Sequence, residues 1–221
     1  EQGAGSYMAS FNEFEGIPAT ANKYLLDDVL RKQWGFKGFI VTDYTGIPEM
    51  INHGIGDLQT VSARALDAGI DMDMVSEGFT KTLRQSLSEG KITQALIDQA
   101  CRRILEAKYR LGLFSDPYKY CNEEKASKVL FSAENRQVSR EIADECQVLL
   151  KNESNLLPLK RSGRIAVIGP LGDAAGDMPG TWAATGKGDQ SVSLYQGIKT
   201  AIGNNGVVTY AKGSDLVADS L

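Results

Sequence analysis

Histidine and cysteine are scarce in this sequence, which removes several kinds of catalytic and metal site. The 221 residues contain one histidine, His53, and three cysteines, Cys101, Cys121 and Cys146. One histidine leaves almost no material for a zinc site or a serine–histidine–aspartate triad. The cysteines have neither metal-ligand spacing nor the even number of a disulfide framework. We expect no metal and no cofactor, free buried thiols at Cys101 and Cys146, and a surface position for His53.

An excess of positive charge and a long apolar run are also missing. The net charge is −4 and the isoelectric point is near 5.2, which argues against a nucleic-acid surface. No apolar run approaches the roughly 20 residues that cross a bilayer. The first five residues, EQGAG, have neither the basic nor the apolar region of a signal peptide. We therefore expect no nucleic-acid or membrane partner, and a chain that begins in mid-protein. The oligomeric state stays open.

What the sequence does contain is an average globular composition, with 42% hydrophobic and 24% charged residues. Apolar patterns alternate between strand and helix spacing. The expected strands are 6–11, 39–42, 70–74, 164–169 and 207–210. The expected helices are 22–33, 57–68, 79–89, 93–111, 132–151 and 191–203, with Thr93 and Gly112 as caps of the fourth. Short buried strands that alternate with helices predict parallel α/β architecture.

The order of these patterns predicts three segments. Residues 1–114 hold the first strands and helices, residues 115–163 form a linker with a polar helix, and residues 164–221 open a second α/β unit. A (β/α)8 barrel takes about 250 residues, and the strands before the linker are too few to close one. We therefore expect both α/β pieces to be incomplete.

Asp43 is the candidate reactive group. It follows the apolar strand 39–42 and precedes Gly46, and parallel α/β folds place their reactive groups where strands end. On position alone, Asp43 could equally cap the next helix through its side-chain oxygens. The position of Asp71 inside a strand pattern favours a structural hydrogen-bonding role over a catalytic one.

Several segments, collinear along the chain, carry a family resemblance. Residues 35–44, GFKGFIVTDY, resemble the nucleophile signature of glycoside hydrolase family 3, and residues 25–34 extend it. Further similar segments are 8–12, 16–18, 68–74, 148–153, 156–159 and 165–170. The chain is similar to the bacterial periplasmic β-glucosidase branch over essentially its whole length.

The resemblance implies a fold and an activity. Residues 1–114 would be the C-terminal part of a TIM-type barrel, and residues 164–221 the beginning of an α/β sandwich domain. The enzyme would be a retaining β-glycosidase that removes terminal β-D-glucosyl residues, with Asp43 as nucleophile, in the periplasm or secreted. The family's acid/base glutamate would lie beyond this sequence, so the chain alone is expected to be inactive.

The resemblance also implies contacts with a β-glucoside or oligosaccharide substrate. Tyr44 follows the nucleophile, where relatives often have a residue near the sugar. Phe11 replaces a tyrosine of many relatives, and it could be a pocket wall or plain core; Met8 leaves the same choice. Trp182 could stack on a sugar face. A second tryptophan found in some plant relatives would fall at Gly186 and is absent.

The sequence fits three other functions to different degrees. A nucleotide-binding protein is disfavoured, because residues 180–187 have five residues between the glycines instead of four, and Gly188 stands where Ser or Thr would bind magnesium. β-Xylosidase activity stays open, because most sugar-recognising residues of the family are not in this chain. A catalytically inactive carbohydrate-binding or structural fragment is the third possibility.

Overall fold

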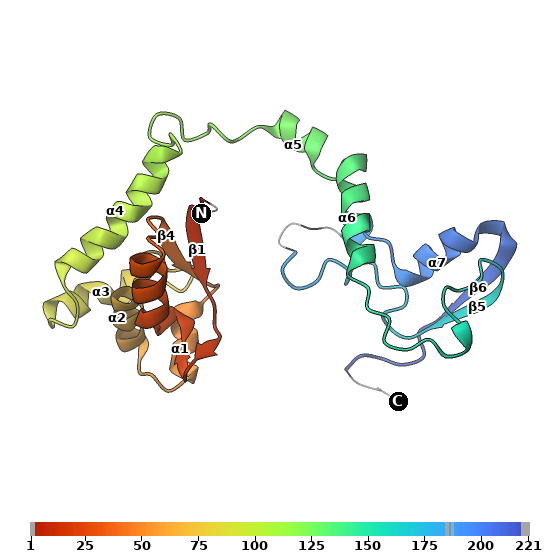
Figure 1. Cartoon of the computed structure of the whole chain (residues 1–221), viewed down its shortest axis with the longest axis horizontal. Coiled ribbons are helices and arrows are strands. Elements are labelled where there is room, and N and C mark those ends of the chain that lie inside the picture. The colour runs from red at the N-terminus through yellow and green to blue at the C-terminus, as the bar shows by residue number, and fades with distance from the viewer. Residues whose placement is uncertain (1–2, 184–185, 187, 218–221) are drawn as a thin grey trace. The chain divides into compact units, whose positions relative to one another are not determined.

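The structure is a computed structural model that describes residues 3–183, 186 and 188–217 (Figure 1). The chain divides into two compact units, Glu1–Leu130 and Phe131–Leu221. The division falls within the predicted linker, whose bounds stay a prediction. Three positions of the disfavoured phosphate loop, 184, 185 and 187, and residues 218–221 of the last predicted segment lie outside the described residues.

The first unit combines short strands with helices, although it does not alternate them strictly as the sequence predicts. Its strands are β1 (Ser6–Ala9), β2 (Glu13–Phe14), β3 (Ile17–Pro18) and β4 (Phe39–Thr42). Its helices are η1 (Ala19–Ala21), η2 (Tyr24–Gln33), α1 (Gly46–Asn52), α2 (Leu58–Ala68), α3 (Gly78–Ser88), α4 (Gln94–Arg110) and α5 (Glu123–Val129). The mixed α/β class is confirmed. Helices α1 and α5 were not predicted, and η2 is a π-helix.

The parallel pair β1–β4 is the centre of this unit. The two strands pair in register from Ser6 with Phe39 to Ala9 with Thr42. The predicted strand 70–74 is wrong as a full strand, because it joins β4 only through a single parallel bridge between Val41 and Met72. Two side chains interrupt the ladder on either side of that bridge: the Asp71 carboxylate takes the Ile40 N–H and the Thr42 hydroxyl takes the Met74 N–H.

Helices cover this pair and close a small apolar core. Helix α2 packs against α1 and α3, and α4 contacts both α2 and β4. Fully buried side chains come from β4, α1, α2 and the segment after α2: Ile40, Ile47, Val61 and Ile70. Burial of such side chains contributes about 1.5–3 kcal/mol each.

The ends of helices α2 and α4 follow the expected capping chemistry. The Asp57 carboxylate accepts the Thr60 N–H at the start of α2, and Gly69 ends it with a φ of 109°. The predicted cap Thr93 is confirmed, because its hydroxyl accepts the Leu96 N–H. Leu111 is the C-cap of α4, and Gly112 follows it in the left-handed conformation with a φ of 76°.

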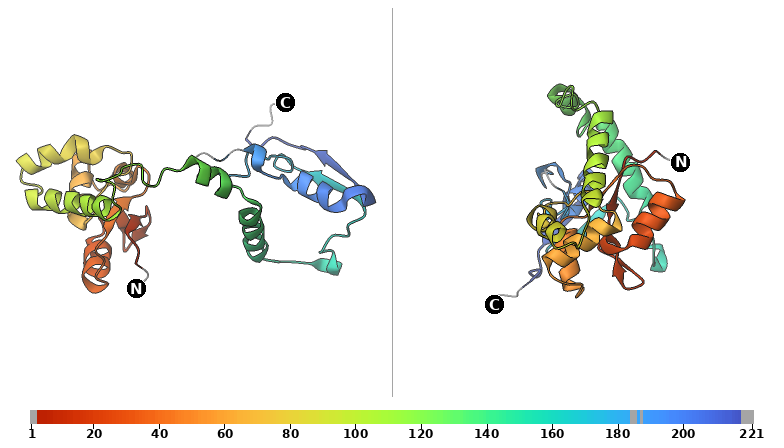
Figure 2. Two further views of the ribbon diagram at one scale, coloured as in Figure 1. Left: turned by 90° about the horizontal axis from the view of Figure 1, so that it is seen from above. Right: turned by 90° about the vertical axis from the view of Figure 1, so that its left-hand side faces the viewer.

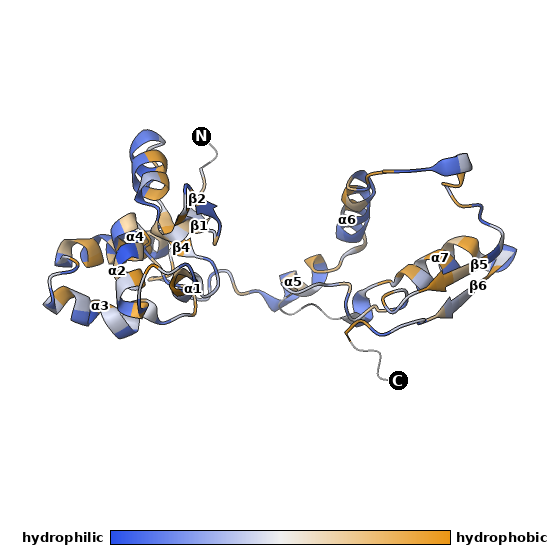
Figure 3. Cartoon of the chain, turned by 90° about the horizontal axis from the view of Figure 1, so that it is seen from below, coloured by the Kyte–Doolittle hydropathy of each residue, from blue (hydrophilic) through white to orange (hydrophobic). Residues whose placement is uncertain are grey.

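The second unit contains a second parallel pair. Its elements are α6 (Ala133–Glu145), η3 (Glu153–Asn155), β5 (Gly163–Ile168), η4 (Gly188–Gln190), α7 (Leu194–Ile202), η5 (Gly203–Asn205) and β6 (Gly206–Ala211). Strands β5 and β6 pair in parallel, and α7 packs beside β6 (Figure 2). Apolar residues lie on β5 and on the neighbouring α7 (Figure 3). The predicted helix 132–151 is too long, because α6 ends at Glu145.

The expected burial of two cysteines is also wrong. Cys101 is exposed on α4, which buries the adjacent Ala100 instead. Cys146 is exposed at the C-cap of α6, a helix without a buried residue. His53 is a surface residue, as expected, and its Nδ1 lies 2.6 Å from the Glu13 carboxylate. None of the described helices combines the length and apolar character needed to span a membrane.

Candidate active site

Asp43 lies directly after β4, at the carboxyl end of the parallel pair. The β-branched and aromatic run from Phe39 to Thr42 forms the strand, with Ile40 and Thr42 fully buried. The chain then leaves the sheet and enters α1 at Gly46. Asp43 is half-buried. The sequence therefore places one carboxylate at the end of a rigid strand, where its backbone is fixed by the sheet and its side chain remains reachable.

Hydrogen bonds fix both the backbone and one carboxylate oxygen of Asp43. Its N–H donates to the Ala9 carbonyl of β1 at 3.0 Å, and its carbonyl accepts the Gly46 N–H at 3.0 Å. Its Oδ1 accepts the Tyr44 N–H at 2.6 Å. Within the described part of the chain, Oδ2 accepts no hydrogen bond. One oxygen is thus oriented by the backbone while the other is open to a reacting group.

The capping alternative for Asp43 is wrong. The N-cap of α1 is Thr45, which has a φ of 55° and makes no side-chain capping bond. The carboxylate of Asp43 accepts only the N–H of the next residue and reaches no amide of the helix. A threonine in the left-handed region is strained, and such strain concentrates at functional sites.

A second set of bonds ties the segment around Asp43 to residues 72–74 on its other side. The Thr42 N–H donates to the Met72 carbonyl at 3.0 Å, and the Thr45 N–H donates to the Met74 carbonyl at 3.1 Å. Between them, the Met74 N–H donates to the Thr42 Oγ1 at 2.9 Å. Asp43 is therefore held between β1 on one side and residues 72–74 on the other.

The predicted substrate contacts lie in different places. Phe11 is half-buried. Its ring lies 3.8 Å from where a Cβ on Gly46 would stand, so it packs next to the start of α1. Tyr44, next to Asp43, is 46% exposed, and Met8 on β1 is 57% exposed. Trp182 is 75% exposed in the second unit. Their contacts with substrate stay predictions.

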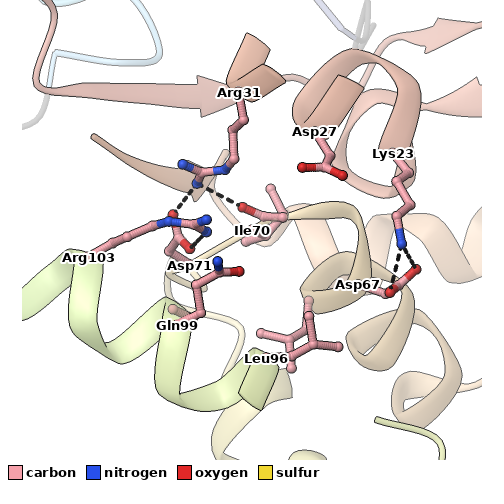
Figure 4. A pocket seen from close by; sticks show the side chains of 12 residues that line it. Lys23, Asp27, Arg31, Asp67, Ile70, Asp71, Leu96, Gln99 and Arg103 are labelled. Atoms are coloured by element: carbon pink, nitrogen blue, oxygen red, sulfur yellow. Dashed lines mark hydrogen bonds and ion pairs between the residues drawn. The ribbon is translucent and has the colours of Figure 1, made fainter. Parts of the chain in front are cut away.

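Asp71 has the structural role that the sequence favoured. Its side chain is 1% exposed, and its Oδ2 accepts Arg31 Nη2 at 2.5 Å and the Ile40 N–H at 2.9 Å. Its Oδ1 accepts Arg103 Nη1 at 2.8 Å (Figure 4). Burial lowers the pKa of the Arg31 guanidinium from its ordinary value, although the Asp71 carboxylate beside it acts in the opposite direction.

Sequence reasoning missed both arginines. Arg31 follows the buried Leu30 in η2, and Arg103 lies in α4, so each is 30 to 40 residues away from the carboxylate it binds. The only local signal was a charged residue next to the apolar face of a predicted helix.

The Asp71 cluster borders a small cavity of about 90 Å³, and half of its twelve lining residues are charged. Lys23 binds Asp67 across its mouth at 3.0 Å (Figure 4). Asp43 does not line this cavity. Among the residues that the structure describes, no three histidine, cysteine or carboxylate side chains gather as metal ligands. This cavity therefore belongs to the scaffold that supports β4.

Known proteins similar to this chain are glycosidases. Residues 1–107 match the Glycosyl hydrolase family 3 N terminal domain, and residues 147–218 match the Glycosyl hydrolase family 3 C-terminal domain. The chain is 43% identical to a periplasmic beta-glucosidase of Salmonella typhimurium, over 99% of this chain and 29% of that protein. It is 35% identical to a beta-xylosidase of Formosa agariphila, over 98% of this chain and 32% of that protein.

A solved structure shares the fold as well as the sequence. The crystal structure of a beta-glucosidase from Listeria innocua in complex with glucose matches 98% of this chain, with a TM-score of 0.77 and 33% identity. The match covers 30% of that chain, so the present sequence spans about a third of the length of the relatives. Two adjacent domain matches in the family's order, a relative at 43% identity and this shared fold agree. The chain belongs to glycosyl hydrolase family 3.

Proposed function

We propose that the protein acts as a retaining β-glycosidase on terminal β-D-glucosyl residues, with Asp43 as its nucleophile. The observation that carries the proposal is the position of Asp43 at the carboxyl end of β4, half-buried, with Oδ1 bound to a backbone amide. Such a carboxylate is oriented and accessible at once. Relatives named beta-glucosidase support the sugar class.

The chemistry requires two carboxyl groups. Asp43 would attack the anomeric carbon and form a glycosyl–aspartate ester while the leaving oxygen takes a proton from a general acid, and water would then hydrolyse the ester. In retaining enzymes the two groups stand about 5–5.5 Å apart. We assign only the nucleophile to this chain and place the acid/base outside it. For that reason we expect the isolated 221-residue chain to hydrolyse no glycoside.

The proposal includes an architecture for the complete protein. The first unit would be the C-terminal part of a (β/α)8 barrel, and the β5–β6 pair would begin an α/β sandwich domain. The parallel pairing of β1 with β4, the bridge to Met72 and the helices around them support the barrel assignment. A nucleophile after β4 agrees with the rule that barrel active sites lie where strands end.

Four side chains would contact the substrate. Tyr44 adjoins the nucleophile and presents an exposed ring, and Phe11 would form a wall below it. Met8 lies on β1, which hydrogen-bonds to the nucleophile strand. Trp182 would stack on a sugar face from the second domain.

A mechanism-based label tests the nucleophile. The intact protein would be treated with a 2-deoxy-2-fluoro-β-glucoside that carries a good leaving group, digested and analysed by mass spectrometry. We expect one sugar on the peptide that contains Asp43. A label on another acid would remove Asp43 from this role.

A second candidate activity is that of a β-xylosidase. The Formosa relative at 35% identity is named beta-xylosidase, and it matches nearly the whole chain. A panel of nitrophenyl β-glycosides separates the two, since a glucosidase should prefer the glucoside in kcat/KM.

The named relative from Salmonella also supports a periplasmic location, which fractionation of cells would test.

A further inference from the structure

We propose that Thr42 is a positioning residue for the nucleophile, and that its hydroxyl fixes the segment that presents Asp43. This inference rests on the proposed function, because it concerns how Asp43 is aimed. Thr42 precedes Asp43 and is fully buried, so its side chain has no access to substrate. Its effect must therefore reach the reaction through Asp43.

The hydroxyl replaces a backbone group in the sheet. The Val41–Met72 bridge is made by the Met72 N–H to the Ile40 carbonyl and the Thr42 N–H to the Met72 carbonyl. In a regular parallel ladder, the next bond would join the Met74 N–H to the backbone carbonyl of Thr42. The Met74 N–H instead donates to the Thr42 Oγ1 at 2.9 Å. The ladder therefore ends on a side chain, directly beside Asp43.

Because the Thr42 hydroxyl takes the place of a backbone carbonyl, the chain can turn after β4 and remain bonded to β1 and to residues 72–74. After the Thr42 bond, the Thr45 N–H donates to the Met74 carbonyl at 3.1 Å. Thr42 and Thr45 thus bind the N–H and the carbonyl of Met74, with Asp43 and Tyr44 between them in the chain. On the opposite side the Asp43 N–H donates to Ala9. Loss of the bond to the Thr42 hydroxyl would leave this segment held to residues 72–74 only by the Thr42 and Thr45 N–H groups, within the described part of the chain.

The Thr42 side chain is closely packed, so a variant that tests its hydroxyl has to keep its shape. A Cβ on Gly46 would stand 3.2 Å from the Thr42 Cβ, so the start of α1 lies directly over this side chain. Valine keeps the shape of threonine and removes the hydroxyl, while serine keeps the hydroxyl and removes a methyl group. The two variants separate the hydrogen bond from the packing.

The test compares Thr42→Val, Thr42→Ser and a control, Thr82→Val, in the intact protein. Thr82 is a half-buried threonine whose hydroxyl donates to the Gly78 carbonyl within α3. The main readout is the rate constant for covalent labelling by the fluoroglucoside. We expect Thr42→Val to be labelled about 10- to 100-fold more slowly, since a displacement of about 1 Å costs about 100-fold in rate. Thr42→Ser should stay within about threefold of the unmodified protein, and Thr82→Val should match it.

Two results would overturn the role of Thr42. One is labelling of Thr42→Val at the unmodified rate, and the other is labelling of Thr42→Ser as slow as that of Thr42→Val. Thermal unfolding of all variants measures lost stability, and Thr42→Val should lose more than Thr82→Val, because it leaves the Met74 N–H without its acceptor.

Hydrogen exchange separates this inference from the proposed function. The Met74 amide should exchange about five- to tenfold faster in Thr42→Val than in Thr42→Ser, because a hydrogen bond is lost. If the unmodified protein is labelled by neither a glucoside nor a xyloside reagent, the proposed function fails. Unchanged protection of Met74 would instead refute the Thr42 contact, whatever the activity.

Discussion

Asp43 and Asp71 lie on neighbouring segments of the same small sheet, yet they differ in burial and in the charged groups that they bind. Asp71 is buried, accepts two arginines and a backbone amide, and lies beside Ile40 in the body of the sheet. Asp43 is half-buried, accepts one backbone amide through its side chain, and follows the last residue of β4. Asp71 bonds to Ile40 within β4, whereas Asp43 follows the end of that strand and has no arginine partner among the described residues.

Both residues are aspartates, so the difference between them lies in charge neutralisation: two arginines pair with Asp71, and none pairs with Asp43 among the residues that the structure describes. A buried carboxylate with both oxygens paired to arginine has no oxygen left to attack a substrate. A carboxylate that the backbone holds by one oxygen keeps that capacity. The differences between the two predict opposite effects of their removal.

The largest expected effect is on catalysis at Asp43. Asp43→Ala should reduce turnover of nitrophenyl β-glucoside by the intact protein by about 10⁴-fold or more, because the covalent step is lost. Azide should restore part of the rate and give a glycosyl azide. The urea unfolding midpoint should hardly change. Near-normal turnover by this variant would end the assignment.

The next largest effect is on stability at Asp71. Asp71→Ala should lower the free energy of unfolding by about 3–5 kcal/mol, because the buried Arg31 and the half-buried Arg103 lose the carboxylate that they share. Asp67→Ala is the control on the same cavity, since the Lys23–Asp67 pair is about half exposed and worth about 1 kcal/mol or less. Urea titration by circular dichroism measures both. Equal losses would contradict the distinction between the two pairs.

The two arginines should differ from one another. Arg31 donates to the Gly38 and Gly69 carbonyls as well as to Asp71, whereas Arg103 has Asp71 as its one partner in the described part of the chain. Arg31→Met should therefore cost about 2–3 kcal/mol and Arg103→Met about 1–2 kcal/mol. The same titration checks the order. A larger loss for Arg103→Met would show that the carbonyl bonds of Arg31 contribute little.

The smallest effect concerns acid stability at a surface carboxylate. Hydrogen bonds from Lys91, Gln85 and Gln59 lower the pKa of Glu89 from 4.5 to about 2. A carboxyl with a lowered pKa in the folded state stabilises the fold above pH 4.5, and that contribution disappears as the pH falls toward 2. Glu89→Gln should slightly flatten the fall in stability over this range. The comparison is Glu77→Gln. The Glu77 carboxylate pairs with one residue, Lys81, among those that the structure describes, so its loss should change the pH dependence of stability less.

Patterns within a few residues predicted much of this fold. Strand β4 has the bounds that its apolar run indicates, and Thr93 caps α4 through the predicted bond. The missed helix α1 is only seven residues long and starts after a left-handed threonine, which sequence spacing does not reveal. The position of Asp43 at a strand end could be predicted because it depends on the strand alone.

What sequence could not supply were contacts across long separations. The Asp71–Arg31 pair joins residues 40 apart, and the Thr42–Met74 bond joins residues 32 apart. The expected strand 70–74 shrank to a bridge because these side chains replace its backbone partners. Burial of Cys101 was mispredicted because an apolar pattern in α4 does not say which residues face α2.

Helix η2 determines where Arg31 points. In this π-helix the Trp34 N–H bonds to the Val29 carbonyl, five residues back, whereas an α-helix bonds four residues back. Leu26 and Arg31 are also five residues apart, and both are buried. Deletion of one half-buried residue between them, such as Asp28, would favour ordinary α-helical winding and rotate the guanidinium away from Asp71. A one-residue change in the length of η2 would thus loosen the strand that precedes Asp43, without altering any residue of that strand.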